Sequence, residues 1–309
     1  MRWFHESVDR LHVVLANVFV PRIFRRNLDT PSLQEHLAAV QLELPPLTTR
    51  RRYTLTAHTV VGKVEAGFQV RLGPRPDVPV LVYHHGIAEM PYDKSFRGIF
   101  RARRPVEAHL VAVRAPFHRS WFTLFAGLAS LSNFLAMCAV SLKLIEAVRC
   151  LLVDRGARGS LVTGTSLGGF LALMHHLIYG TADCYAPLLA GPDLAHTLLS
   201  THFQRFLAPQ ALAQSAHIQA LLDFRQAFHA SDTRRILPLL AAYDLDMPYA
   251  HHYPCYAARA VPVATITRGH ITGSVAFAAL RAHLLTCLQP LLHAGRIGHH
   301  SEGKTWSPP

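Results

Sequence analysis

Short apolar runs recur along most of the chain. Between residues 52 and 72 apolar and polar positions alternate, which is typical of antiparallel strands with one buried face, and the Gly62-Lys63 pair is expected in the turn. Later runs are almost continuously apolar, as expected for strands buried on both faces. The pattern predicts strands over 52–61, 66–72, 78–84, 109–114, 160–163, 184–189, 236–243 and 261–267.

Helical stretches separate most of these runs, notably 142–153, 169–178 and 274–288. Strand–helix alternation of this kind predicts the α/β class, with a doubly wound and mostly parallel sheet. Residues 1–48 are expected to form an N-terminal helical extension that is amphipathic in places. The main domain is expected over 49–293, followed by a loose polar tail over 294–309.

The stretch from Ser120 to Leu142 carries no charge, and Arg119 and Lys143 flank it. Its length is sufficient to span a bilayer. It also contains serine, threonine and asparagine, and it lies between two expected strands of one sheet. A buried or lid-forming helix is therefore preferred over a transmembrane helix.

Composition excludes several classes of protein. Half of the residues are hydrophobic and 16% are charged, which excludes a disordered chain. The five cysteines include no C-x-x-C pair, so neither a zinc ribbon nor a disulfide framework is expected. The 21 histidines include adjacent pairs, which are poor chelates, and H-E-x-x-H is absent. We expect no metal and no cofactor.

The chain is basic, with 31 Lys+Arg against 19 Asp+Glu, and the excess is densest before Trp121. A basic surface suits nucleic acid, anionic lipid or an acidic substrate. The arginine clusters lack interleaved aromatic side chains, so nucleic acid is not an expected partner. A solvated basic face or peripheral membrane contact is preferred. Because the N-terminus lacks the apolar core of a signal peptide, a cytoplasmic location is expected, with membrane association left open.

The most informative motif is Gly164-Thr165-Ser166-Leu167-Gly168, which fits G-x-S-x-G between an apolar run and a helical stretch. Glycines on both sides allow a sharp strand-to-helix turn. The serine then lies at a helix N-terminus, whose partial positive charge favours a developing anion. The motif predicts that Ser166 is a nucleophile; the alternative is an ordinary tight turn.

With this motif, the sequence over roughly residues 52–290 resembles the α/β-hydrolase superfamily. The resemblance implies a triad in the order serine, acid, histidine. Asp244 matches the position of the acid by its spacing to Pro248, and Asp246 is an alternative acid. His270 follows the last expected strand and is the implied general base.

The resemblance also implies an oxyanion hole made of two backbone amides. These are the amide of Leu167, directly after the serine, and the amide of Ile87, after a His-Gly pair in which His85 helps to hold the loop. The chain departs from the family after the 109–114 strand. It has no glycine-rich turn there, so the pocket entrance is expected to differ in shape.

In similar proteins a helical cap follows the strand after the serine, and residues 192–235 occupy that place. Together with the apolar stretch at 121–142, this cap predicts an apolar acyl pocket. We expect a serine hydrolase that cleaves small lipophilic carboxylic esters, or thioesters, through an acyl-enzyme. Two alternatives remain open: a non-catalytic protein of this fold bound at a membrane surface, and an acyltransferase. The acyl length, the leaving group and the oligomeric state are not determined by the sequence.

Overall fold

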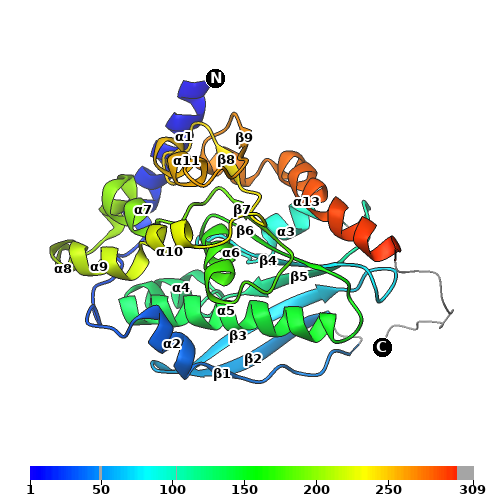
Figure 1. Ribbon diagram of the computed structural model, residues 1–309. Coiled ribbons are helices and arrows are strands. Elements are labelled where there is room, and N and C mark those ends of the chain that lie inside the picture. Colours follow the sequence, from blue (N-terminus) through cyan, green and yellow to red (C-terminus); the bar gives the residue numbers. More distant parts are fainter. Residues whose placement is uncertain (49–50, 102, 298–309) are drawn as a thin grey trace.

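A nine-stranded sheet forms the centre of the computed structural model, which describes residues 1–48, 51–101 and 103–297 (Figure 1). The strand order is β1-β2-β3-β5-β4-β6-β7-β8-β9, with antiparallel pairing as far as β5 and parallel pairing from β5 to β9. The expected α/β class with a mostly parallel sheet is confirmed. The strands are β1 Gln41–Leu42, β2 Arg52–Thr59, β3 Gly62–Arg71, β4 Val80–His84, β5 His109–Arg114, β6 Ser160–Thr165, β7 Cys184–Leu188, β8 Leu239–Ala241 and β9 Ala264–Ile266.

Two apolar cores lie on the two faces of the sheet. Along β4 the side chains of Val80 and Val82 belong to one core, and those of Leu81 and Tyr83 to the other, because successive side chains of a strand point to opposite faces. Helices cover both faces (Figure 1). They are α1 Arg2–Phe19, α2 Leu33–Ala39, α3 Lys94–Ile99, α4 Trp121–Leu128, α5 Leu131–Val153, α6 Leu167–Ile178, α7 Leu194–Ser200, the 3-10 helix η1 His202–Phe206, α8 Pro209–Ala213, α9 Ser215–Leu222, α10 Arg225–Ala230, α11 Tyr249–Ala257, α12 His270–Ser274 and α13 Phe277–Ile297.

The hairpin turn between β2 and β3 differs from its prediction. The turn residues are Val60 and Val61, whereas Gly62 and Lys63 already belong to β3. Gly62 has a φ of +96°, which glycine adopts readily, so the glycine is required directly after the turn and not within it. The alternation of buried and exposed residues along β2 agrees with the predicted one-sided strand.

The uncharged stretch predicted as one helix is two. Ser130 separates α4 from α5. Its hydroxyl accepts a hydrogen bond of 3.2 Å from the Asn133 amide and so caps the N-terminus of α5. α5 is a buried core helix and continues through the separate stretch predicted at 142–153. α4 is more exposed. Among the described residues, no helix combines the length and the apolarity that crossing a bilayer requires.

The end of the chain also differs from its prediction. The final helix expected at 274–288 is divided into α12 and α13, and α13 continues to Ile297, into the segment expected to be loose. Residues 298–309 lie outside the described part. All five cysteines are free.

The N-terminal segment is integrated into the molecule. α1 packs against α12, and the chain that follows α1 bonds to two other elements. The Ile23 amide donates to the Phe206 carbonyl, and the Phe24 amide donates to the Leu128 carbonyl, both at 2.8 Å. Residues 192–235, expected to be a cap, contain α7, η1, α8, α9 and α10. Helix α1 and the cap helices therefore lie next to each other around one end of the sheet (Figure 1).

Candidate active site

The turn from β6 to α6 holds Ser166 in a strained conformation. Its φ is +57° and its ψ is −119°, which a residue with a side chain rarely adopts. Hydrogen bonds on both sides hold this backbone, from the Ser166 amide to the Leu188 carbonyl at 2.9 Å and from the Phe170 amide to the Ser166 carbonyl at 3.0 Å. The strain raises the hydroxyl above the end of β6, at the first turn of α6.

The glycines of the motif are required by close backbone contacts. A Cβ atom at Gly168 would lie 2.1 Å from the carbonyl oxygen of His84, and one at Gly164 would lie 2.5 Å from the same oxygen. Real Cβ atoms do not approach backbone this closely. The two predicted elbow glycines thus let β4, β6 and α6 converge beneath the serine.

A chain of two hydrogen bonds connects three predicted residues from three different strand ends. His270 Nε2 lies 3.0 Å from Ser166 Oγ, and His270 Nδ1 lies 2.7 Å from Asp244 Oδ2. Asp244 is buried, and its other oxygen accepts bonds from the amides of Asp246 and Met247 at 2.9 and 2.7 Å. The carboxylate is therefore fixed with one oxygen toward the imidazole.

The alternative acid, Asp246, is near the imidazole of His270 but bonds to a different histidine. Its Oδ1 bonds to His202 Nε2, and its buried Oδ2 has no hydrogen-bond partner among the described residues.

Burial alone lowers the pKa of an imidazole, but the carboxylates of Asp244 and Asp246 outweigh it and raise the pKa of His270 to about 9. Burial raises the pKa of Asp244 to about 6.

Helix α1 supplies a buried carboxylate to the same site. Asp9 is fully buried; its Oδ2 accepts a hydrogen bond from the His270 amide at 2.8 Å, and its Oδ1 accepts one from the Ile271 amide at 3.0 Å. The Leu245 amide, next to Asp244, donates to Oδ2 at 3.3 Å. Gly269 permits this approach, since a Cβ atom there would lie 2.7 Å from the carboxylate.

The loop after β4 is held by buried histidines. The Ala115 amide donates to His85 Nε2 at 3.1 Å, so the proton is on Nδ1, which donates to the Gly86 carbonyl at 2.8 Å. Burial keeps the pKa of His85 well below its usual range, which preserves this neutral form. His118 Nε2 lies 2.8 Å from the Ile87 carbonyl oxygen. His85 thus holds the loop as expected, and His118 adds a second contact.

An apolar pocket of about 180 Å³ opens beside Ser166. Both predicted oxyanion residues, Ile87 and Leu167, line it, and the other lining residues come mostly from α1, α4 and the cap. The volume is below the ~300–1,000 Å³ of most ligand pockets. The pocket therefore suits one slender apolar group. Further lining residues include Ala16, Val20, Phe24, Leu124, Phe125, Leu128, Phe134, Leu194, Leu198, Phe203, Phe206 and Met247.

Comparison with solved structures gives matches over most of the chain. A thermostable carboxyl esterase from Bacillus coagulans aligns with a TM-score of 0.55 at 12% identity, covering 79% of this chain and 100% of its own. An acetyl xylan esterase from Paenibacillus sp. R4 aligns at 0.53 and 14% identity, covering 82% and 88%. This chain has the α/β-hydrolase fold.

A third match is longer than this chain. The acylaminoacyl peptidase of Pyrococcus horikoshii aligns with a TM-score of 0.53 at 10% identity, covering 82% of this chain and 49% of the peptidase. This chain thus spans about half the length of that α/β-hydrolase-fold enzyme. No protein-family model matches the sequence, and no curated protein sequence matches it. The likeness therefore concerns the fold.

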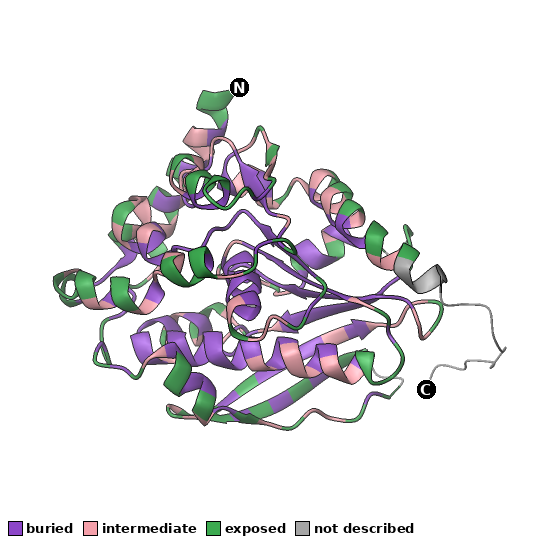
Figure 2. Ribbon diagram, in the orientation of Figure 1, coloured by how far each residue is buried: buried purple, intermediate pink, exposed green. Residues whose placement is uncertain are grey.

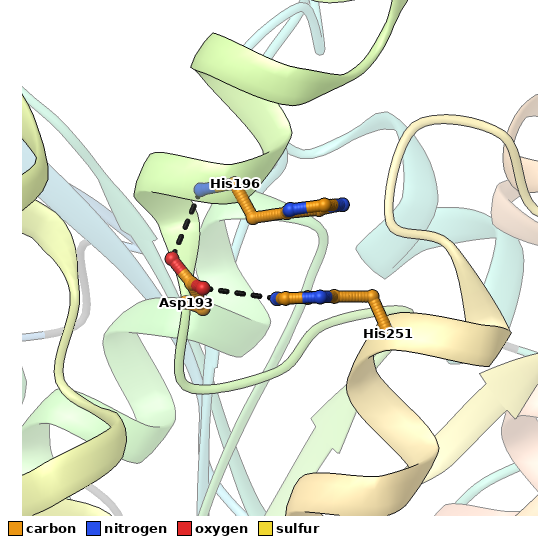
Figure 3. A group of neighbouring side chains, drawn as sticks. All are labelled: Asp193, His196 and His251. Atoms are coloured by element: carbon orange, nitrogen blue, oxygen red, sulfur yellow. Dashed lines mark hydrogen bonds and ion pairs between the residues drawn. The ribbon is translucent and has the colours of Figure 1, made fainter. Parts of the chain in front are cut away.

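One further group of ligand-type side chains lies between the cap and α11: Asp193, His196 and His251 (Figure 3). The two imidazoles stack with ring centroids 3.5 Å apart and planes 6° apart. Parallel rings cannot both direct their in-plane lone pairs at one ion. Arg225 Nε lies 3.2 Å from Asp193 Oδ2, so the carboxylate already has a cationic partner. The cluster joins α7 to α11 and fits a metal ion poorly.

Sequence analysis missed Asp9, His202 and His118 as neighbours of the site. For Asp9 the sequence gives little signal, because Glu6, Ser7, Arg10 and His12 surround it and make it one polar residue among several. For His202 and His118 the chain offers no signal among its 21 histidines.

Proposed function

We propose that this protein is a serine hydrolase that cleaves carboxylic esters of apolar acyl groups through an acyl-enzyme. The observation that carries the proposal is the hydrogen-bonded series Ser166–His270–Asp244, which ends at an apolar pocket. The strained turn at Ser166 and the raised pKa of His270 support the same interpretation, because both are typical of a nucleophile and its base.

In the proposed reaction the Ser166 hydroxyl attacks the ester carbonyl carbon while its proton passes to His270 Nε2. Asp244 keeps the proton of His270 on Nδ1 and stabilises the cation that forms. The tetrahedral intermediate then collapses: the C=O bond re-forms, the bond between the former carbonyl carbon and the alkoxy oxygen breaks, and the leaving alkoxide takes the proton from His270. Water attacks the acyl-enzyme in the second half: it gives its proton to His270, and Ser166 recovers that proton as the acid leaves.

The tetrahedral intermediate carries an oxyanion, for which two amide donors are proposed. The Leu167 amide belongs to the first turn of α6, where amides have no partner within the helix. The Ile87 amide belongs to the loop that His85 and His118 hold. Losing one such donor typically costs about 10²–10³-fold in kcat. The proposed reaction uses no cofactor.

The first test is labelling with a fluorophosphonate, read by intact mass. The wild-type protein is expected to gain one adduct, and Ser166→Ala none. Ser200→Ala removes an exposed serine at the end of α7 and serves as the matched control, which should label like the wild type. Absence of an adduct on folded wild-type protein, with and without detergent, would contradict the proposal.

The second test identifies the acyl group and the acceptor. A series of p-nitrophenyl esters of increasing acyl length, with matched thioesters, measures kcat/KM. Added alcohols and thiols, followed by mass spectrometry of the products, distinguish hydrolysis from acyl transfer. Free acid as the dominant product in every case supports a hydrolase, and transfer to an acceptor in preference to water would replace it with an acyltransferase.

A further inference from the structure

Helix α1 has the reverse of the usual surface-helix pattern. A surface helix normally turns apolar side chains inward and polar ones outward. In α1 the polar His5 and Asp9 are buried, at 5% and 0% exposure. The outward positions recur every three or four residues, so they form one continuous face. They are Trp3, Phe4, Leu11, Val14, Leu15, Val18 and Phe19, all exposed.

Helix α4 lines the pocket beside Ser166 together with α1, and it also carries exposed apolar side chains. Trp121 is 45% exposed and also lines the pocket beside Ser166, and its neighbour Phe122 is 87% exposed. α1 contributes His12 and Ala16 to the same pocket, and Val20 directly after the helix also lines it. The two helices that wall the pocket thus carry the exposed apolar side chains, which we call the α1–α4 surface. Exposed residues dominate the free end of α1 (Figure 2).

Exposed arginines belong to α1 or flank α1 and α4 along the chain. Arg2 and Arg10 belong to α1, Arg22 and Arg25 follow it, and Arg119 precedes α4; all are exposed. Of the acidic side chains on α1, Glu6 bonds to Arg2 at 2.7 Å and Asp9 is buried. Glu6 offsets the charge of Arg2, and the other four arginines, which we call the rim of the α1–α4 surface, remain positively charged.

We infer that the α1–α4 surface docks on an anionic phospholipid bilayer, from which a lipophilic ester reaches Ser166. The apolar face enters the interface between headgroups and acyl chains, and the arginines contact anionic headgroups. The second half of the inference rests on the proposed ester hydrolysis. The first half, binding, does not require catalysis.

The charge of the rim favours a bilayer over a second copy of the chain. Self-association through this surface would bring two sets of arginines together, and like charges repel. A net charge of +12 adds to that repulsion. Anionic lipid neutralises the same arginines instead.

The test measures sedimentation of Ser166→Ala protein with phosphatidylcholine vesicles, with and without phosphatidylglycerol. Binding is expected only with the anionic lipid, and it should weaken as salt is raised. Substituting Leu11→Gln, Val18→Gln and Phe122→Gln together should weaken binding by about a hundredfold or more, because each removes apolar area from the interface. Val60→Gln with Val153→Gln, at exposed apolar sites elsewhere, is the matched control and should bind like its parent.

Three results would overturn the inference. The first is no binding to anionic vesicles, and the second is an equal loss of vesicle binding in the control variant. The third is a dimer of the parent protein in sedimentation velocity that is absent in the triple variant. Hydrolysis of a water-soluble short-chain ester separates this inference from the proposed function. For this measurement the three glutamine substitutions are made in the protein that retains Ser166. This variant should still hydrolyse the water-soluble ester but should lose activity on esters embedded in anionic vesicles. Loss of both activities in folded protein would also count against the inference.

Discussion

The Oδ2 atom of Asp9 accepts a hydrogen bond of 2.8 Å from the backbone amide of His270, 261 residues further along the chain. Because the same oxygen accepts from the Leu245 amide, one buried carboxylate connects the loops that carry Asp244 and His270. Helix α1 therefore contributes to the geometry of the hydrogen-bonded series and to the charge around its imidazole.

Replacing Asp9 by Asn is expected to lower kcat more than it changes KM. The amide places donors against backbone N–H groups and removes a negative charge that helps to raise the pKa of His270. The pH dependence of kcat/KM should therefore shift to lower pH, which a purely structural defect would not produce. Asp9→Ala should also lower Tm by several degrees, since each buried amide left without a partner costs about 1–3 kcal/mol.

The control for Asp9 is Glu6→Gln. It removes a partly exposed carboxylate of the same helix whose partner is Arg2. Its pH profile and Tm should match the wild type. An unchanged pH profile for a folded Asp9→Asn enzyme would show that Asp9 has no influence on His270.

Asp244 and Asp246 are distinguishable by substitution. Asp244→Asn should reduce kcat on the order of 10⁴-fold, because the imidazole then loses the acceptor that sets its tautomer. Asp246→Asn removes a carboxylate bonded to His202 and should cost far less. Steady-state kinetics with a short-chain ester measures both. The reverse order of the two losses would identify Asp246 as the acid.

The wild-type kcat/KM is expected to rise with pH up to about 9. His270 must be neutral to take the serine proton, and neighbouring carboxylates raise its pKa to about 9, so activity falls as pH drops below that value. Below pH 6 the fall should steepen, because Asp244, whose pKa is about 6, is protonated as well.

In Asp246→Asn the rise of kcat/KM that follows the deprotonation of His270 should occur at lower pH, because the Asp246 charge contributes to the raised pKa of His270. Asp154→Asn changes an exposed carboxylate at the end of α5 and should leave the profile in place. Profiles recorded at constant ionic strength make the comparison. If kcat/KM of Asp246→Asn rises at the same pH as that of the wild type, Asp246 does not influence the pKa of His270.

The pocket predicts a limit on acyl length that a single side chain can shorten. Leu198 of α7 is 8% exposed and lines the pocket. Leu198→Phe should reduce kcat/KM for the longest acyl groups that the wild type accepts by about 10–200-fold, the scale of one methylene-sized clash. Acetate esters should be little affected. Leu199→Phe, one position along the same helix, is the matched control, and an equal effect there would contradict the assignment of the pocket.

The sequence by itself determined the fold class and the position of the strained turn. Apolar runs separated by helical stretches are a local property, and they predicted the parallel strands as far as β9. The spacing of Gly164, Ser166 and Gly168 also predicted a sharp turn from strand to helix, but not that the close neighbour would be β4: a Cβ at Gly168 or Gly164 would lie 2.1 or 2.5 Å from the His84 carbonyl oxygen. Helix boundaries were less well predicted: Ser130 was not recognised as the cap of α5, although the Asn133 amide that bonds to it is only three residues further along the chain.

Only the tertiary structure decided which carboxylate lies beside His270. Asp244 was preferred for its spacing to Pro248, with Asp246 two residues away as the alternative acid, and the orientation of their loop turns Asp244 toward the imidazole and Asp246 toward His202. Only the tertiary structure brought Asp9 into the site and turned the apolar face of α1 outward. A helix has one amphipathic pattern in its sequence, whereas the side that is buried depends on what the other elements offer. Here they offer backbone amides, which require a carboxylate.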